Sequence, residues 1–204
     1  MVSLARAVFD LVLPTETAGQ RSVHDVSRED AHFFRRLFEK AIGNLYKVEL
    51  PRTEGWRVLP GKRIAWPVES STPGIGMYLP NMITDIVLEN SLQGRRIIID
   101  TKFTNILTKG KYDNRSFKSE HIYQIYAYLR SQERADDPAS QTSEGMLLYP
   151  AIGLNLNEAA RIQGHLIRFA TVDLAAPSSH IVARLKALVE APSGIVGVAQ
   201  WRDE

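Results

Sequence analysis

The chain has 204 residues, which suffices for one domain with a substantial core but not for two full domains. Its composition is 44% hydrophobic and 24% charged, without internal repeats or low-complexity tracts, which is typical of a folded soluble protein. Lys and Arg number 25 and Asp and Glu number 23, so the overall charge neither requires nor excludes a nucleic-acid partner.

The sequence contains no Cys, which excludes disulfides and thiolate metal sites. Carboxylates and five His therefore remain as candidate metal ligands, and a hard cation bound by oxygen atoms is the natural expectation. No apolar run approaches the roughly 20 residues of a membrane-spanning helix, and the N-terminus lacks a signal-peptide pattern. We expect a cytoplasmic protein that does not contact a membrane.

The chain divides into an N-terminal segment, one main domain and a tail. Residues 1–26 are expected to hold a short helix at 3–13 and a loop at 14–26, where Thr, Gly, Gln and Ser are frequent. The main domain is expected to span residues 27–190, and residues 191–204 form a C-terminal tail.

A strong helix signal opens the main domain. Ser27 followed by Asp30 has the form of a capping box, which predicts the start of a helix. Apolar residues then recur at helical spacing: Phe34, Leu37, Phe38, Ala41, Ile42 and Leu45. Residues 50–80 are interrupted by Pro, Gly and Ser, and contain one predicted strand at 62–68.

Two β-type runs follow, at residues 82–88 and 95–103. The intervening residues 89–94 include Asn90 and Gly94, which favour a turn. The pattern therefore predicts an antiparallel hairpin.

The second half of the chain alternates helices and strands. The basic stretch 108–118 is expected to be a polar, mobile loop, with Ser119 capping a helix at about 121–131. The apolar face of this helix is formed by Ile122, Ile125, Tyr126 and Leu129. Further predictions are a loop at 132–144, strands at 146–149 and 166–174, and an amphipathic helix at 178–188. The order indicates an α/β fold in which helices flank a mixed central sheet.

Charged residues interrupt both strands of the predicted hairpin. Asp100 and Lys102 share one face of their strand, because successive side chains alternate, and Asp85 lies where an apolar residue is usual. Burying such groups costs several kcal/mol unless each finds a partner or a metal, in the range of about 2–7 kcal/mol for an unpaired polar group. An Asp and a Lys two residues apart are usually a solvated or salt-bridged strand edge, but the second Asp on the neighbouring strand favours a functional site.

Two converging carboxylates provide the oxygen ligands that Mg²⁺ prefers, and Mn²⁺ is an alternative. A metal held by Asp85 and Asp100 would activate water and stabilise charge on a phosphate group. Lys102 would position the attacking water or neutralise the transition state. These residue types therefore indicate metal-dependent hydrolysis of a phosphodiester.

At these residues the sequence resembles the PD-(D/E)XK nuclease superfamily, and more closely the nuclease region of the McrC family from McrBC modification-dependent restriction systems. Three blocks carry the resemblance: residues 79–86 (LPNMITDI), residues 98–103 (IIDTKF) and residues 123–129 (YQIYAYL). Weaker similarity covers roughly residues 30 to 190. The resemblance implies a PD-(D/E)XK core over the main domain and an endonuclease that cleaves double-stranded DNA.

The resemblance also implies a role for each matching residue. Asp85 and Asp100 would ligate the metal together with the carbonyl of Thr101, and Lys102 would be catalytic. It further implies catalytic or supporting roles for three residues: Glu39, Gln124 and Tyr128. Spacing agrees for the last two, because residues at i and i+4 share a helix face. The alternatives are an exposed helix face for this pair and a solvent-directed side chain for Glu39.

Other polar residues receive weaker roles. The five His lack the spacing of a zinc site, and only His121, one turn before Gln124, lies close to the predicted site. The basic run between the Asp-x-Lys strand and the following helix is a candidate DNA-backbone contact, although a charged loop is often only solvated. Its members are Lys109, Lys111, Arg115 and Lys118.

The leading hypothesis is the cleavage subunit of a 5-methylcytosine-dependent restriction system, whose partner would be a McrB-like AAA+ GTPase motor. Two alternatives remain open. One is a free-standing RecB-like repair or mobile-element nuclease, which would cleave DNA without a nucleotide-hydrolysing partner. The other is a non-catalytic DNA-binding or assembly module, which would bind neither Mg²⁺ nor Mn²⁺.

Overall fold

The computed structural model describes residues 28–109 and 115–190. The helix predicted at 3–13, the loop at 14–26, the Ser27 cap and the tail at 191–204 lie outside the described residues. Within the described ranges no helix is long and apolar enough to cross a membrane.

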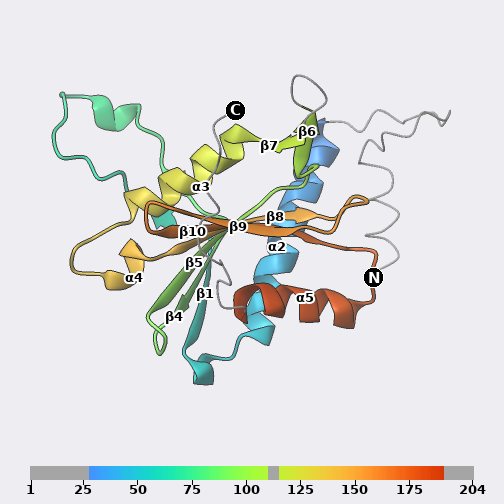
Figure 1. Cartoon of the computed structure of the whole chain (residues 1–204). Helices are drawn as coiled ribbons and strands as arrows, with labels where there is room; N and C mark the ends of the chain where they lie inside the picture. The colour runs from blue at the N-terminus through green and yellow to red at the C-terminus, as the bar shows by residue number, and fades with distance from the viewer. Residues whose placement is uncertain (1–27, 110–114, 191–204) are drawn as a thin grey trace, which may run out of the picture.

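A six-stranded mixed sheet forms the centre of the molecule (Figure 1). Its strands, in spatial order, are β1 (Trp56–Pro60), β4 (Ile86–Asn90), β5 (Arg95–Thr101), β8 (Glu144–Pro150), β10 (His165–Val172) and β9 (Asn157–Ile162). The three middle strands β5, β8 and β10 run parallel, and the outer pairings are antiparallel. The middle strands are apolar runs because helices cover both of their faces. The predicted α/β class with a mixed, helix-flanked sheet is confirmed.

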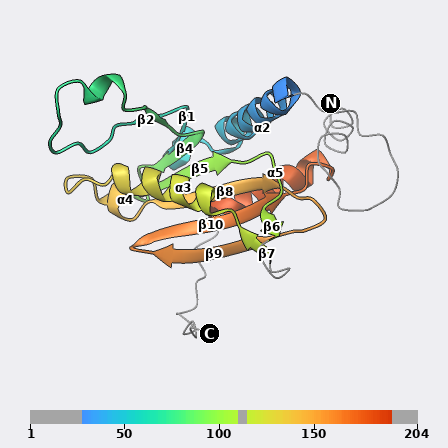
Figure 2. The same cartoon turned by 90° about the horizontal axis from the view of Figure 1, so that it is seen from above.

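Helices α2 (Arg28–Glu49) and α5 (Ser178–Glu190) cover one face of the sheet, and α3 (Ser119–Ser131) covers the other (Figure 2). Alternate residues of β5 show the division, since Ile97 and Ile99 pack toward α2 and α5 while Ile98 packs toward α3. The short α4 (Pro138–Gln141) lies within the predicted loop at 132–144.

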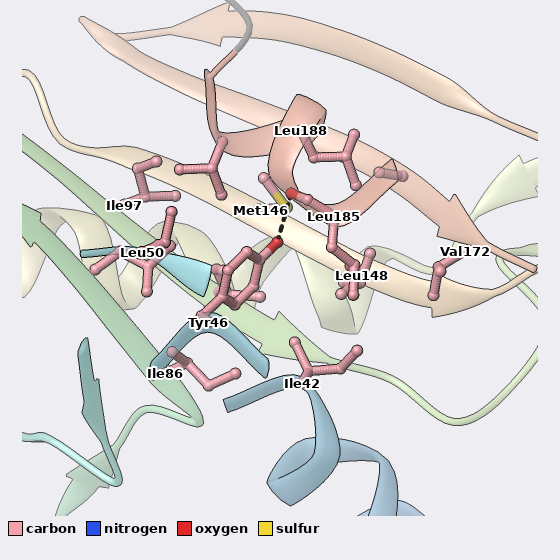
Figure 3. Close-up of a cluster of buried hydrophobic side chains, with 14 of the residues drawn as sticks. Ile42, Tyr46, Leu50, Ile86, Ile97, Met146, Leu148, Val172, Leu185 and Leu188 are labelled. Atoms are coloured by element: carbon pink, nitrogen blue, oxygen red, sulfur yellow. Dashed lines mark hydrogen bonds between the residues drawn. The ribbon is translucent and has the colours of Figure 1, made fainter. Parts of the chain in front are cut away.

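The first core cluster packs α2 and α5 together against one face of the sheet (Figure 3). The buried hydrophobic side chains of α2 recur at every fourth position, at Phe38, Ile42 and Tyr46, and Leu50 continues this spacing directly after the helix. The Tyr46 hydroxyl donates a hydrogen bond of 3.1 Å to the carbonyl of Leu185 in α5. The predicted apolar face is therefore rotated, because Leu37 and Ala41 are exposed.

The second core cluster holds α3 against β8. Ile125 and Leu129 are fully buried, and Ile122 and Tyr126 pack at the edge of the cluster, as predicted. The helix begins at Ser119, the residue expected to cap it, and its N-cap is Lys118. Lys118 makes no side-chain capping bond, so the helix starts without a polar cap.

The predicted strand at 82–88 is in fact two strands that belong to different sheets. β3 (Met82–Ile83) pairs with β2 (Arg63–Ile64), whereas β4 joins the central sheet. The chain crosses between the sheets at Thr84, whose amide and hydroxyl both donate to the carbonyl of Lys62 at 3.0 Å. Asp85 therefore lies directly before β4 rather than inside a strand.

The strand predicted at 62–68 is confined to β2. Four further elements were not predicted from the sequence: β1, β9, η1 (Arg52–Glu54) and η2 (Ile75–Met77). The segment carrying η2 projects from the body of the molecule (Figure 1). Trp66 closes the base of this segment by donating a 2.6 Å bond from Nε1 to the carbonyl of Pro80.

The basic stretch predicted as a loop contains a small hairpin. β6 (Leu107–Lys109) pairs with β7 (Arg115–Phe117), and residues 110–114 lie outside the described residues. Phe117 stacks on Phe169 of β10 with ring centroids 4.0 Å apart. This aromatic contact attaches the hairpin to the second core cluster. The prediction of a mobile loop considered the basic residues of the segment and missed this contact.

Candidate active site

The two predicted carboxylates meet at the end of the β4–β5 pair. The last ladder pair at this end joins Ile86 to Ile99, and Asp85 and Asp100 are the next residue of each chain segment. Thr101 fixes the first carboxylate, because its amide and its hydroxyl both donate to Asp85 Oδ2 at 2.7 Å. The tight antiparallel hairpin thus delivers two acidic side chains to one edge of the sheet.

Asp100 is a buried carboxylate that pairs with Lys102 without a well-directed hydrogen bond to Oδ2. Its exposed fraction is 2%, and Lys102 Nζ lies 2.8 Å from Oδ2 at ion-pair distance but without hydrogen-bond geometry. Among the described residues no well-directed hydrogen bond reaches this oxygen. Burial raises the pKa of Asp100 to about 6; Lys102 opposes that rise and Asp85 adds to it. A buried acceptor left without a donor is costly unless it serves a ligand.

Lys102 lies one residue beyond β5 and is held by a chain of hydrogen bonds. Its Nζ donates to Gln124 Oε1 at 2.6 Å, and Gln124 Nε2 donates to the Tyr128 hydroxyl at 2.9 Å. That hydroxyl donates to the carbonyl of Ile83 at 2.9 Å. The helix α3 therefore positions the ammonium group beside Asp100 and ties it to β3.

The structure brings Gln124 and Tyr128 together on one side of α3, next to Lys102. Tyr128 is 7% exposed and belongs to the same buried cluster as Ile125. Burial raises the pKa of its hydroxyl, and Asp100 and Asp85 contribute to the rise while Gln124 opposes it. The exposed-face interpretation is therefore wrong for Tyr128, which stays a neutral donor.

Glu39 reaches the same site from α2. Burial raises the pKa of this half-buried carboxyl, and the charges of Asp85 and Asp100 raise it further against the effect of Lys40. These effects place Glu39 within electrostatic range of Asp85 and Asp100. Its supporting role in the site stays a prediction.

The donor set suits a hard divalent cation. Asp85 and Asp100 supply carboxylate oxygens, and one oxygen of Asp100 is buried without a donor. Mg²⁺ commonly uses one or two carboxylates and fills its other positions with water and substrate phosphate. In residues 28–109 and 115–190 no group of three or more His, Cys, Asp or Glu side chains forms a metal cluster, and the predicted set needs only two. The predicted role of the Thr101 carbonyl stays a prediction.

A pocket of about 370 Å³ opens beside Lys102. Its lining consists of Arg35, Lys102, Phe103, Thr104, Glu120, His121 and Gln124. Arg35 and Thr104 were not among the predicted site residues. Arg35 lies one turn before Glu39, so extending the i, i+4 argument to α2 would have placed it on the site's side of the helix.

The basic run is only partly described. Arg115 is exposed on β7, and Lys118 donates from Nζ to Thr104 Oγ1 at 3.1 Å, which brings it beside the pocket. The side chain of Lys109 and all of Lys111 lie outside the described residues. Contact of this run with DNA stays a prediction.

His121 is buried beneath the pocket, and its Nδ1 shares a 2.9 Å hydrogen bond with the Tyr149 hydroxyl. Burial, with the positive charges of Lys102, Lys118 and Arg35, lowers its pKa to about 4, and Glu120 opposes them. His121 is therefore a neutral imidazole at physiological pH. His165 is likewise packed, between Ser143 and Glu133.

We expect this neutral His121 to make stability depend on pH. In the unfolded chain His121 takes up a proton near pH 6.5, but the folded state resists it until about pH 4. Its contribution is thus fully present above pH 6.5 and is lost as the pH falls toward 4, by about 1–2 kcal/mol after allowance for solvent screening. Denaturant unfolding at pH 7, 5.5 and 4.5 should show a smaller loss for His121→Gln than for the wild type. Equal losses in both proteins would contradict the assignment.

Comparison with known proteins supplies the wider context. The chain matches the family model described as McrBC 5-methylcytosine restriction system component over residues 35–150, more than half of its 204 residues. The matched range contains all six predicted catalytic or supporting side chains: Glu39, Asp85, Asp100, Lys102, Gln124 and Tyr128. No curated protein matches the chain.

The α/β fold and the family match together identify the class of this protein as a component of a DNA restriction system. The chain belongs to the family of McrBC 5-methylcytosine restriction system components, in agreement with the predicted resemblance to the McrC nuclease region.

Proposed function

We propose that this chain is a Mg²⁺-dependent DNA endonuclease and the cleavage subunit of a McrBC-like restriction system. The observation that carries the proposal is the buried, unsatisfied Oδ2 of Asp100, which lies at the sheet edge with Asp85 and Lys102. A purely structural ion pair would be expected to satisfy its buried oxygens, whereas a metal ligand needs one available.

The arrangement of elements supports a PD-(D/E)XK core. The hairpin β4–β5 carries the two Asp and the Lys, and the parallel strand β8 extends the sheet beside them. Helices on opposite faces contribute Glu39 and the Gln124–Tyr128 pair. This order of acidic helix, catalytic hairpin and Gln-x-x-x-Tyr helix is the one that the resemblance to McrC implies.

The residues divide the work of phosphodiester hydrolysis. Asp85 and Asp100 would hold the metal with the Thr101 carbonyl, and a bound Mg²⁺ would supply an activated water and neutralise phosphate charge. Lys102, fixed by Gln124, would stabilise the negative charge that develops on the attacked phosphate. Mn²⁺ would fit the same oxygen ligands.

The proposed substrate is double-stranded DNA, and the family description supports dependence on 5-methylcytosine. A McrB-like AAA+ GTPase motor is the proposed partner. The described residues form a six-stranded sheet with its covering helices and two small two-stranded sheets, and none of these elements is assigned to reading a modified base in this proposal. Recognition of the modified base would then fall to the partner.

The decisive experiment measures cleavage of a methylated DNA duplex by the full chain with and without a McrB-like partner and GTP. We expect cleavage with Mg²⁺ or Mn²⁺, none with a chelator, and none by Asp85→Ala. Full cleavage by folded Asp85→Ala would overturn the proposed site. Cleavage without any partner would favour the free-standing nuclease, and absence of metal binding by calorimetry would favour the non-catalytic module.

A further inference from the structure

The pocket beside Lys102 is also lined by positively charged and neutral polar groups that the proposed catalysis does not use. Arg35 lies on α2, Thr104 follows β5, and His121 is in the first turn of α3, so three elements converge on one space. Lys118 reaches the same place through its bond to Thr104. Convergence of groups from separate elements is typical of a binding site rather than of a solvated surface.

Arg35 is the group whose placement most needs an explanation. It is exposed and, in the described part of the chain, its guanidinium forms no ion pair or hydrogen bond. Glu39 lies four residues later on the same helix, the usual spacing for an intrahelical ion pair, yet the two are not joined. Arg35 instead lines the pocket.

The electrostatics of the pocket are mainly positive. His121 experiences the charges of Arg35, Lys102 and Lys118 together, and it is itself a neutral group that brings no negative charge. The one acidic lining residue, Glu120, has a side chain that is 76% exposed and lies 3.5 Å from His121 Nε2. Because Glu120 is so exposed, it can turn to solvent when an anion enters.

We propose that this pocket binds a backbone phosphate of the DNA strand next to the one that is cut, with Arg35 as its principal contact. The inference rests on the proposed function, and it deepens that function by naming where the substrate strand lies. Lys102 belongs to both the catalytic group and the pocket wall, so the two phosphates are neighbours along one strand. Arg35 is suited to the role because its planar guanidinium can bind phosphate oxygens in pairs.

The first test measures binding without cleavage. The full chain carrying Asp100→Asn is titrated with a fluorescent DNA duplex at several salt concentrations, and Arg35→Gln is added in the same background. We expect Arg35→Gln to weaken binding by about tenfold and to reduce the slope of log K against log salt by about 0.9, the value for one lost phosphate contact. Arg35→Lys should restore the slope but not the full affinity.

The matched control is Arg36→Gln. Arg36 is the next residue of α2, is also exposed, and does not line the pocket. The Arg36→Gln substitution removes the same charge from the same turn of the helix. A general electrostatic effect would therefore change DNA binding equally in both variants. Equal slopes for Arg35→Gln and Arg36→Gln would overturn the proposal.

A second test separates this inference from the proposed function. In the otherwise unaltered chain, Arg35→Gln should lower kcat/KM for DNA cleavage by about tenfold while the affinity for Mg²⁺ is unchanged. If Asp85→Ala abolishes cleavage but Arg35→Gln does not affect it, the phosphate site is wrong and the nuclease assignment survives. If neither the unaltered chain nor Asp85→Ala binds or cleaves DNA, the proposed function itself fails.

Discussion

Asp100→Asn is expected to reduce DNA cleavage by on the order of 10³-fold, the loss that follows when several kcal/mol of transition-state stabilisation is removed. Asn keeps the shape of the side chain but supplies a weaker, neutral ligand in place of a carboxylate. The effect should appear in kcat at saturating DNA, because Asp100 contributes to the reaction rather than to the attachment of the duplex.

The same substitution is expected to leave the free energy of unfolding unchanged or to raise it slightly, by at most about 1 kcal/mol. Asp100 is a 2% exposed carboxylate whose burial outweighs the attraction of Lys102, so a neutral amide is better tolerated there. In this variant Lys102 keeps its hydrogen bond to Gln124 and still borders the open pocket. Its positive charge is therefore not left buried without a partner or solvent.

Two measurements check this prediction together: single-turnover cleavage and denaturant unfolding. Asp136→Asn is the control, because its side chain is 79% exposed and lies away from the site, and neither quantity should change. Substitution of a functional residue lowers the cleavage rate without lowering the free energy of unfolding. Loss of more than about 2 kcal/mol of stability by Asp100→Asn would instead indicate a structural ion pair.

The catalytic hairpin could be predicted because its signals are local. Asp100 and Lys102 interrupt an apolar run, and the turn at residues 91–94 is set by Asn90, whose Oδ1 accepts the amides of Leu92 and Gln93. Alternation along β5 then assigned the faces correctly. Each of these features depends on residues only a few positions apart.

Features that depend on distant partners could not be predicted. The break between β3 and β4 is set by contacts of Thr84 and Asp85 with residues 61–62, more than twenty positions earlier in the chain. Tyr128 is buried because its hydroxyl finds the carbonyl of Ile83, 45 residues away. Periodicity identifies the helix face that such a residue occupies, but not the acceptor that allows a polar side chain to be buried there.

Gly145 shows how close packing positions the site. It is the second residue of β8, directly beneath α3, and a Cβ atom added there would lie 2.8 Å from Ile125 Cγ1 and 3.0 Å from Leu129 Cδ1. Both neighbours are fully buried, so neither can move aside freely. Only the absence of a side chain allows the helix to approach the strand this closely.

Gly145→Ala is therefore expected to lower the free energy of unfolding by about 1–3 kcal/mol, the usual cost of overpacking a core. Gly43→Ala provides a matched comparison with the opposite sign. Gly43 is inside α2, and its added Cβ would meet Ile86 Cγ1 at an ordinary 3.6 Å, so the better helix propensity of Ala should stabilise the protein by about 0.5–1 kcal/mol. Denaturant unfolding of both variants measures the two shifts.

The Gly145 variant should also lose cleavage at temperatures where it remains folded. Gln124 and Tyr128 lie on α3 beside the two displaced side chains, and they hold Lys102 through bonds of 2.6 and 2.9 Å. A helix moved outward by a few tenths of an ångström lengthens these bonds, and catalysis is sensitive to such misplacement. Gly43→Ala should cleave normally, since α2 need not move. If Gly145→Ala is less stable yet fully active, Lys102 does not depend on α3 for its position.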